Sequence, residues 1–134
     1  MMSVRVVRAK GDVKFDRIAP AGFRILSALD LLTSKVDRDL LITSGTDFHL
    51  PPDPHALGEA YDLSVVGWSV VELALALRFL RLTLGDPFTI LYEVPVAPED
   101  ATLRSMATVN PHATGAHLHI QRKKGTTYPP VSIS

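Results

Sequence analysis

The sequence predicts an α+β fold, in which a small, mainly antiparallel sheet carries two main helices within one domain spanning residues 1–134. Three observations favour it. The chain has 134 residues, a length that suits one hydrophobic core. Short β-prone runs alternate with two longer segments whose apolar residues recur every three or four positions, as in amphipathic helices. No internal repeat or linker interrupts this order, so the elements belong to one layered unit.

The first half of the chain contains two expected strands and one helix. The valines of residues 4–7 are broken by arginines, which is the alternation of a half-buried strand. A helix begins at Pro20, because proline suits the first helical position, and residues 40–43 form a β-prone run. From Gly45 to His55 three prolines forbid regular structure, so this segment is a loop. The apolar positions of the helix are Phe23, Leu26, Leu29, Leu32 and Val36.

The second half repeats this alternation of strand and helix. Gly67 ends one strand, and Gly85 is the stop signal of a helix. Four leucines of this helix share one face: Leu73, Leu77, Leu80 and Leu84. Residues 95–115 form a connection rich in proline, alanine and threonine, with one helical turn near residues 100–106. The expected elements are strands at residues 61–66, 88–94 and 116–121 and a helix at residues 69–84.

Charge is balanced overall but unevenly placed. Fourteen basic and fourteen acidic residues cancel, so net charge gives no reason to expect nucleic acid or an anionic membrane as a partner. Residues 1–38 carry eight Lys/Arg against four Asp, whereas residues 39–121 carry three Arg against ten acids. All five histidines also lie in this acidic middle. We therefore expect the middle of the chain to hold a cation.

The sequence also indicates in which cellular compartment the protein is expected. No cysteine is present, which excludes a disulfide scaffold, a thiolate zinc site and a cysteine nucleophile. The N-terminal residues lack the apolar stretch of a secretory signal, and the most apolar segment, residues 63–84, is interrupted by charges as in an amphipathic helix. We expect a protein that is cytoplasmic as synthesised, and either stays there, is released by lysis or is carried in a virion.

Two histidines and one aspartate have the spacing of a metal site. His55 and Asp62 are seven residues apart, between the loop and the next strand, and His117 and His119 are two apart on an expected strand, so their side chains share a face. Nitrogen and oxygen ligands suit zinc, and three protein ligands leave a fourth position for catalysis. The spacing alone also fits two ordinary strand histidines and an aspartate that caps a turn.

A longer pattern raises the expectation of zinc. The residues from Ser44 to Asp62, with His55-Ala-Leu-Gly-Glu-Ala-Tyr-Asp62 at their end, resemble the SxHxxGxAxD signature of the zinc D-alanyl-D-alanine peptidases, whose fold is shared by hedgehog signalling domains. The resemblance covers about residues 40–121 and is specific. It implies that His55, Asp62 and His119 bind zinc. It also implies that His117 is the neighbouring histidine, which either supports the ligands or assists the transition state.

This family also needs a carboxylate base. The usual positions before the last ligand hold Ala113 and Ala116, which cannot move a proton. The hedgehog-like branch places a Tyr-Glu pair at the end of the preceding segment, which here is Tyr92-Glu93. If residues 94–116 loop out, Glu93 can take the proton of the attacking water and pass it to the leaving amine. The alternative is that Glu93 ends a strand and pairs with an arginine.

Departures from the signature concern substrate binding. Asp53 replaces the serine, Glu59 stands where a basic or small residue is commoner, and Thr46-Asp47 replaces an arginine that holds the substrate carboxylate in many of these peptidases. Arg104 or Arg122 could substitute for that arginine. Together these changes favour an endopeptidase, or a domain that has lost catalysis, over D-Ala-D-Ala trimming. His49 and His112 are interpreted as solvated histidines.

The resemblance implies a zinc-dependent metallopeptidase, a hydrolase that cuts peptidoglycan stem peptides or cell-wall precursors. The absence of a secretory signal fits a phage- or prophage-encoded enzyme of cell-wall degradation. A second hypothesis is a catalytically inactive hedgehog-like module that keeps zinc as a structural staple and binds virion proteins or another partner. A third is a fold without metal, in which chelation leaves the melting temperature unchanged.

Overall fold

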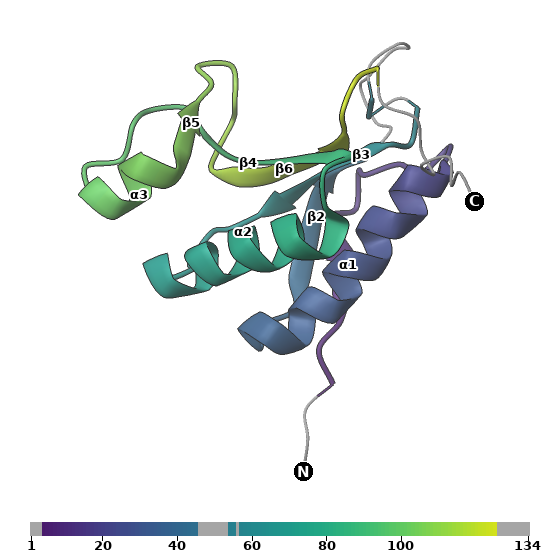
Figure 1. Ribbon diagram of the computed structural model, residues 1–134, viewed down its shortest axis with the longest axis horizontal. Coiled ribbons are helices and arrows are strands. Elements are labelled where there is room, and N and C mark those ends of the chain that lie inside the picture. Colours follow the sequence, from purple (N-terminus) through teal and green to yellow (C-terminus); the bar gives the residue numbers. More distant parts are fainter. Residues whose placement is uncertain (1–3, 46–53, 56, 126–134) are drawn as a thin grey trace.

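The computed structural model describes residues 4–45, 54–55 and 57–125, which form one mixed sheet and three helices (Figure 1). The predicted α+β class is confirmed. The strands are β1 (Val7–Ala9), β2 (Leu40–Ser44), β3 (Ala60–Ser64), β4 (Phe88–Val94), β5 (Ala107–Val109) and β6 (His117–Arg122), and the helices are α1 (Pro20–Val36), α2 (Val70–Leu84) and α3 (Ala101–Met106). In this described part no helix has both the length and the apolar character needed to cross a membrane.

The sheet has the strand order β1-β2-β3-β6-β4-β5. Among the inner strands β2, β3, β6 and β4, each strand is antiparallel to its neighbour. The two outer strands, β1 and β5, are parallel to the strands that they pair with. The last strand of the chain, β6, therefore lies between β3 and β4. This insertion places residues 117–122 at the middle of the sheet, next to two strands that are far from it in sequence.

Helices α1 and α2 lie side by side on one face of the sheet, and α3 lies with β5 at the end of β4 (Figure 1). Pro20 starts α1, as its fixed φ favours. A capping box of Ser69 and Glu72 starts α2, and Gly85 ends it at a positive φ of 75°. The leucines expected on one face of α2 are all buried, which confirms that prediction: Leu73, Leu77, Leu80 and Leu84.

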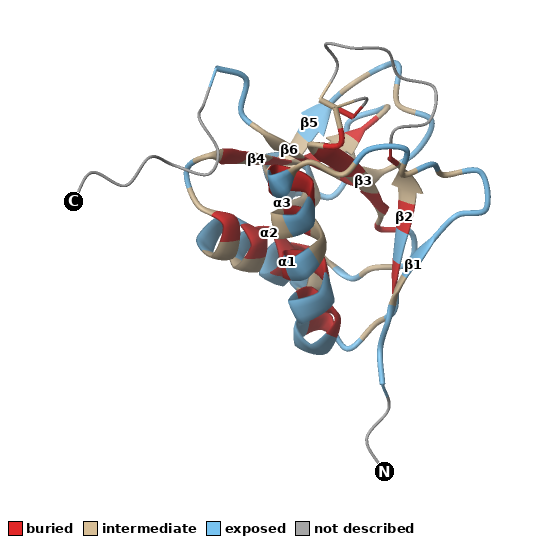
Figure 2. Ribbon diagram, turned by 90° about the vertical axis from the view of Figure 1, so that its right-hand side faces the viewer, coloured by how far each residue is buried: buried red, intermediate tan, exposed pale blue. Residues whose placement is uncertain are grey.

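Strand alternation divides the sheet into a buried and an open face. In β3, Tyr61 and Leu63 are buried under the helices, and in β6 so are Leu118 and Ile120 (Figure 2). The residues between them therefore point to the opposite face, because successive side chains of a strand alternate. That open face carries the polar side chains of the sheet, Asp62 among them.

Several predicted boundaries were wrong. The first strand starts at Val7 rather than at residue 4, and the third covers Ala60–Ser64 rather than residues 61–66. The connection over residues 95–115 holds the expected helical turn, but β5 was not expected and pairs with the end of β4. Phe23 is 60% exposed instead of buried, because at 3.6 residues per turn it lies about 160° around α1 from the fully buried Ile25.

Candidate metal centre

Three inner strands bring four of the predicted site residues together on the open face of the sheet. Asp62 on β3 lies opposite His119 on β6, and Glu93 on β4 lies opposite His117 on β6. Side chains directly opposite each other in antiparallel strands have neighbouring Cβ atoms, so each of these pairs is in reach of contact. Because His117 and His119 alternate with buried residues, both rings point away from the helices.

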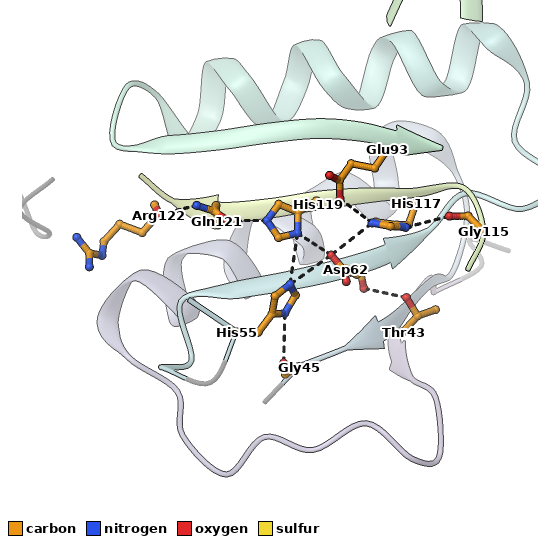
Figure 3. Close-up of polar contacts among 10 residues, drawn as sticks. All are labelled: Thr43, Gly45, His55, Asp62, Glu93, Gly115, His117, His119, Gln121 and Arg122. Carbon is orange, nitrogen blue, oxygen red and sulfur yellow. Dashed lines mark hydrogen bonds and ion pairs between the residues drawn. The ribbon is translucent and has the colours of Figure 1, made fainter. Parts of the chain in front are cut away.

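His55 reaches the same place from the turn before β3. Its side chain is buried, with a residue exposure of 5%, although it lies outside the regular sheet. The ring Nδ1 is 3.2 Å from the carbonyl oxygen of Gly45, and the ring Nε2 faces Nδ1 of His119 at 3.3 Å (Figure 3). The structure thus gathers His55, Asp62 and His119 so that one ligand atom of each lies within 4.8 Å of the others.

The spacing of these three atoms fits a tetrahedral zinc site. Oδ1 of Asp62 lies 3.5 Å from Nε2 of His55 and 2.8 Å from Nδ1 of His119, and the two nitrogens are 3.3 Å apart. Bonds of about 2.0–2.1 Å at tetrahedral angles put neighbouring ligand atoms roughly 3.3–3.4 Å apart. The distance between the two nitrogens, 3.3 Å, meets that value, and the 3.5 Å from Asp62 to His55 is close to it. The third is a hydrogen-bond distance that lengthens by about half an ångström in such a site.

Hydrogen bonds on the outer side of the two rings fix which ring nitrogens point inward. A carbonyl oxygen accepts only, so His55 donates Nδ1–H to Gly45 and directs Nε2 at the centre. His119 likewise donates Nε2–H to Oε1 of Gln121 at 2.6 Å and directs Nδ1 inward. The amide group of Gln121 is oriented by its own bond to the carbonyl of Arg122. Two inward-facing ring nitrogens and a carboxylate oxygen therefore converge, and together they offer a set of ligand atoms for a metal ion.

The electrostatics agree with that conclusion. Burial alone would raise the pKa of Asp62, but hydrogen bonds with His119 and His55 and the nearby imidazole charges hold it well below its usual range. For His119, burial opposes the charged form, and the hydrogen bonds to Asp62 and Gln121 outweigh it, so its pKa is raised. Both shifts favour an ionised Asp62 and a protonated His119 when no metal ion is bound. A metal ion that binds here displaces that proton.

Beside the three-atom cluster, Glu93 and His117 make a second contact. Nε2 of His117 is 3.0 Å from Oε1 of Glu93 and 3.8 Å from Oδ1 of Asp62. On its other side the ring donates Nδ1–H to the carbonyl of Gly115. Glu93 therefore pairs with a histidine and not with an arginine among the described residues. The imidazole of His117 thus lies between the carboxylate of Glu93 and that of Asp62, one of the candidate metal ligands.

A cleft of about 920 Å³ opens over this centre. It is lined by His55, Asp62, Glu93, His117 and His119, with further lining from Lys10 and Asp12 after β1, from the end of β2, and from residues 110 and 112–116. His112 lines the cleft as an exposed residue, and Lys10 is the one lysine or arginine among the described lining residues. Residues 94–116 thus loop out only in part, because residues 110 and 112–116 return to form one wall of the cleft.

Neither predicted replacement for the substrate-binding arginine lines this cleft. Arg122 forms an ion pair with Glu59, with a second hydrogen bond at 3.1 Å, which also explains the acidic residue at position 59. Arg104 donates to the carbonyls of Pro98 and Glu99. The positions of Thr46, Asp47, His49 and Asp53 lie outside the described residues, so their predicted effects stay predictions.

Sequence reasoning missed Gln121, the acceptor that orients His119. The available signal was its spacing, since a residue two positions after a strand histidine shares that histidine's face. Comparison of the chain with family models, with curated proteins and with solved structures finds no match in any of the three.

Proposed function

We propose that this protein is a zinc-dependent hydrolase with His55, Asp62 and His119 as its metal ligands. The observation that carries the proposal is the convergence of two oriented imidazole nitrogens and an ionised carboxylate, whose spacing fits tetrahedral zinc. When bound, zinc supplies a Lewis acid that lowers the pKa of a coordinated water to about 7 and polarises a carbonyl group.

Glu93 and His117 are the residues that we propose for proton transfer. Glu93 takes a proton from the attacking water and delivers it to the leaving amine, which is the role of a positioned carboxylate in hydrolysis. His117 holds that carboxylate through its Nε2 contact and is itself held by Gly115, so the pair has a defined geometry. Protonated at Nε2, His117 also stabilises negative charge that develops on the substrate carbonyl oxygen.

For the substrate we propose a peptide of the peptidoglycan stem or of a cell-wall precursor. Support comes from the sequence resemblance to the hedgehog/D-alanyl-D-alanine peptidase-like family, which also suggests a mainly antiparallel fold of that family. The engagement of Arg122 by Glu59 favours internal cleavage over removal of a terminal residue, because this arginine is not placed to hold a terminal carboxylate.

A second candidate function follows from the Glu93–His117 contact. A carboxylate held by a histidine could stay in that pair and never act as a base. The zinc would then be a structural staple, and the domain would serve as a binding module or a virion component.

Hydrolysis of purified peptidoglycan in the presence of zinc separates the two functions. The proposed enzyme releases peptide fragments, Glu93→Gln keeps stoichiometric zinc but loses roughly 10²- to 10⁴-fold in kcat, and His119→Ala loses both zinc and activity. Thr89→Ala is the matched control, because Thr89 lies on the same sheet face opposite Gln121. Stoichiometric zinc without turnover selects the binding module, and turnover that survives His119→Ala contradicts a metal hydrolase.

A further inference from the structure

The chain between β1 and α1 packs against two glycines that flank His55 in the folded structure. We call residues 14–19 of this connection the 14–19 segment. A Cβ added to Gly45 would lie 2.4 Å from the carbonyl oxygen of Lys14, and one added to Gly58 would lie 2.1 Å from that of Arg17. Both distances are shorter than real Cβ contacts. These backbones therefore touch directly, which only glycine permits.

The same two glycines hold His55 from both sides. Gly45 supplies the carbonyl that accepts from the ring Nδ1 at 3.2 Å, and Gly58 donates its N–H to the backbone carbonyl of His55 at 3.0 Å. Gly58 also has a φ of 71°, which turns the chain back toward β3. Any shift of the 14–19 segment is thus transmitted to the ring and to the backbone of His55.

The start of helix α1 packs against the turn at Gly58. Ala19 donates its N–H to the carbonyl of Gly58 at 3.2 Å. A Cβ added to Gly22, in the first turn of α1, would lie 2.1 Å from that same carbonyl oxygen and 3.0 Å from Oη of Tyr61. Tyr61 is fully buried and cannot swing away. A larger residue at position 22 would therefore push the carbonyl of Gly58, and with it the turn that carries His55, away from α1.

The other two ligands lie on paired strands, although Phe15 of the 14–19 segment also contacts Tyr61, the residue before Asp62. Asp62 and His119 are held opposite each other by the β3–β6 register. We propose that the 14–19 segment and Gly22 position His55, the one proposed ligand outside the sheet, for metal binding. This inference rests on the proposed metal site. Gly22 acts as a positioning residue, because it does not touch the metal ligands themselves.

Zinc titration of Gly22→Ala against a competing chromophoric chelator tests the inference. We expect zinc affinity to fall roughly tenfold to a hundredfold, as when partners of metal ligands are changed, and the visible absorption of bound Co²⁺ to change. Gly11→Ala is the matched control, because a Cβ at Gly11 meets nothing within 4 Å. Equal affinity and equal Co²⁺ spectra for wild type and Gly22→Ala overturn the inference. A wild type that binds no zinc contradicts the proposed function itself.

Hydrogen exchange in the wild-type protein gives a second test that does not depend on the folding of any variant. Coupling between two sites is reciprocal. If the 14–19 segment and Gly22 position His55 for zinc, then zinc bound by His55 must stabilise their packing against the turn. We expect zinc to slow exchange at the amides of Gly58 and Ala19. The amide of Gly85, which closes the end of α2, is the reference and stays unchanged. Unaltered exchange at Gly58 and Ala19 with zinc bound overturns the inference.

Discussion

Gln121 accepts a hydrogen bond from Nε2 of His119 at 2.6 Å, two residues away along the same face of β6. This contact decides which ring nitrogen of His119 points at Asp62 and His55. It also leaves the unprotonated nitrogen of a neutral His119 where a cation can meet it. The orientation of one proposed ligand therefore depends on a residue that binds no metal.

Replacing Gln121 with leucine should weaken zinc binding while leaving all three proposed ligands in place. Without its acceptor the imidazole can adopt the other tautomer or rotate, and such changes cost roughly 10- to 100-fold in metal affinity. Chelator competition measures the change, and Thr89→Val is the control from the neighbouring strand. An unchanged affinity in Gln121→Leu would show that the tautomer is set by something else.

Zinc affinity should rise with pH. Hydrogen bonds to Asp62 and Gln121 outweigh burial and raise the pKa of His119, so the imidazole keeps its proton to a higher pH than an isolated histidine does. Zinc competes with this proton, and the competition disappears only above the raised pKa. Titrations between pH 6 and pH 9 should show proton release on binding, with the apparent Kd falling as the pH rises. A Kd independent of pH over this range would contradict His119 as a ligand.

Much of the fold was predictable because its elements follow local patterns. The leucine spacing identified α2 with its buried face, and proline and glycine identified where helices begin and end. The same alternation that marks β6 as a strand placed His117 and His119 on one face. The three residues of the cluster, His55, Asp62 and His119, were predicted from the resemblance to a zinc-peptidase signature, because spacing alone also fits ordinary strand histidines.

Other features depend on long-range pairing, which local patterns do not contain. Glu93 meets His117 because β6 lies beside β4 in the sheet. Along the chain, residues 95–116 with α3 and β5 separate these two strands. Glu59 was interpreted as a departure from a motif, whereas it is the ion-pair partner of Arg122 across β3 and β6. The close backbone contacts of Gly22 and Gly58 likewise need three segments in place at once. No single stretch of sequence specifies such contacts.

Acid should weaken the contribution of Glu72 to stability. Its hydrogen bond with Arg38, reinforced by Ser69, lowers the pKa of Glu72 to about 2. A lowered carboxyl pKa stabilises the fold above the unfolded value of about 4.3, and this contribution is lost as the pH falls toward the folded value. Glu72→Gln should therefore be less stable than wild type at pH 7, with the difference closing between about pH 4 and pH 2.

Urea denaturation at several pH values measures this difference. Glu99→Gln is the control, because Glu99 is exposed and its side chain forms no ion pair among the described residues. Ser69→Ala should lose about 1 kcal/mol through the lost cap, at neutral pH as well. A Glu72→Gln deficit that persists unchanged at pH 2 would show that the charge of Glu72 is not its cause.

Zinc should raise the melting temperature of the wild-type protein, and removal of zinc by a chelator should reverse the change. A ligand at 100 times its Kd that binds only the native state adds about 2.7 kcal/mol, which for a chain of this size is on the order of 10 °C. Mg²⁺ and Ca²⁺ should give much less, because two of the three proposed ligands are imidazole nitrogens, which suit zinc better than these oxygen-seeking ions. Differential scanning calorimetry measures the shift directly.

The histidines can be told apart in the same experiment. His55→Ala should abolish the zinc-dependent shift, since it removes one of only three proposed protein ligands. His112→Ala should keep the shift in full, because His112 lines the cleft as an exposed residue and does not belong to the three-residue cluster. A shift that survives His55→Ala but disappears in His112→Ala would place the metal at the wall of the cleft and not at the centre of the sheet.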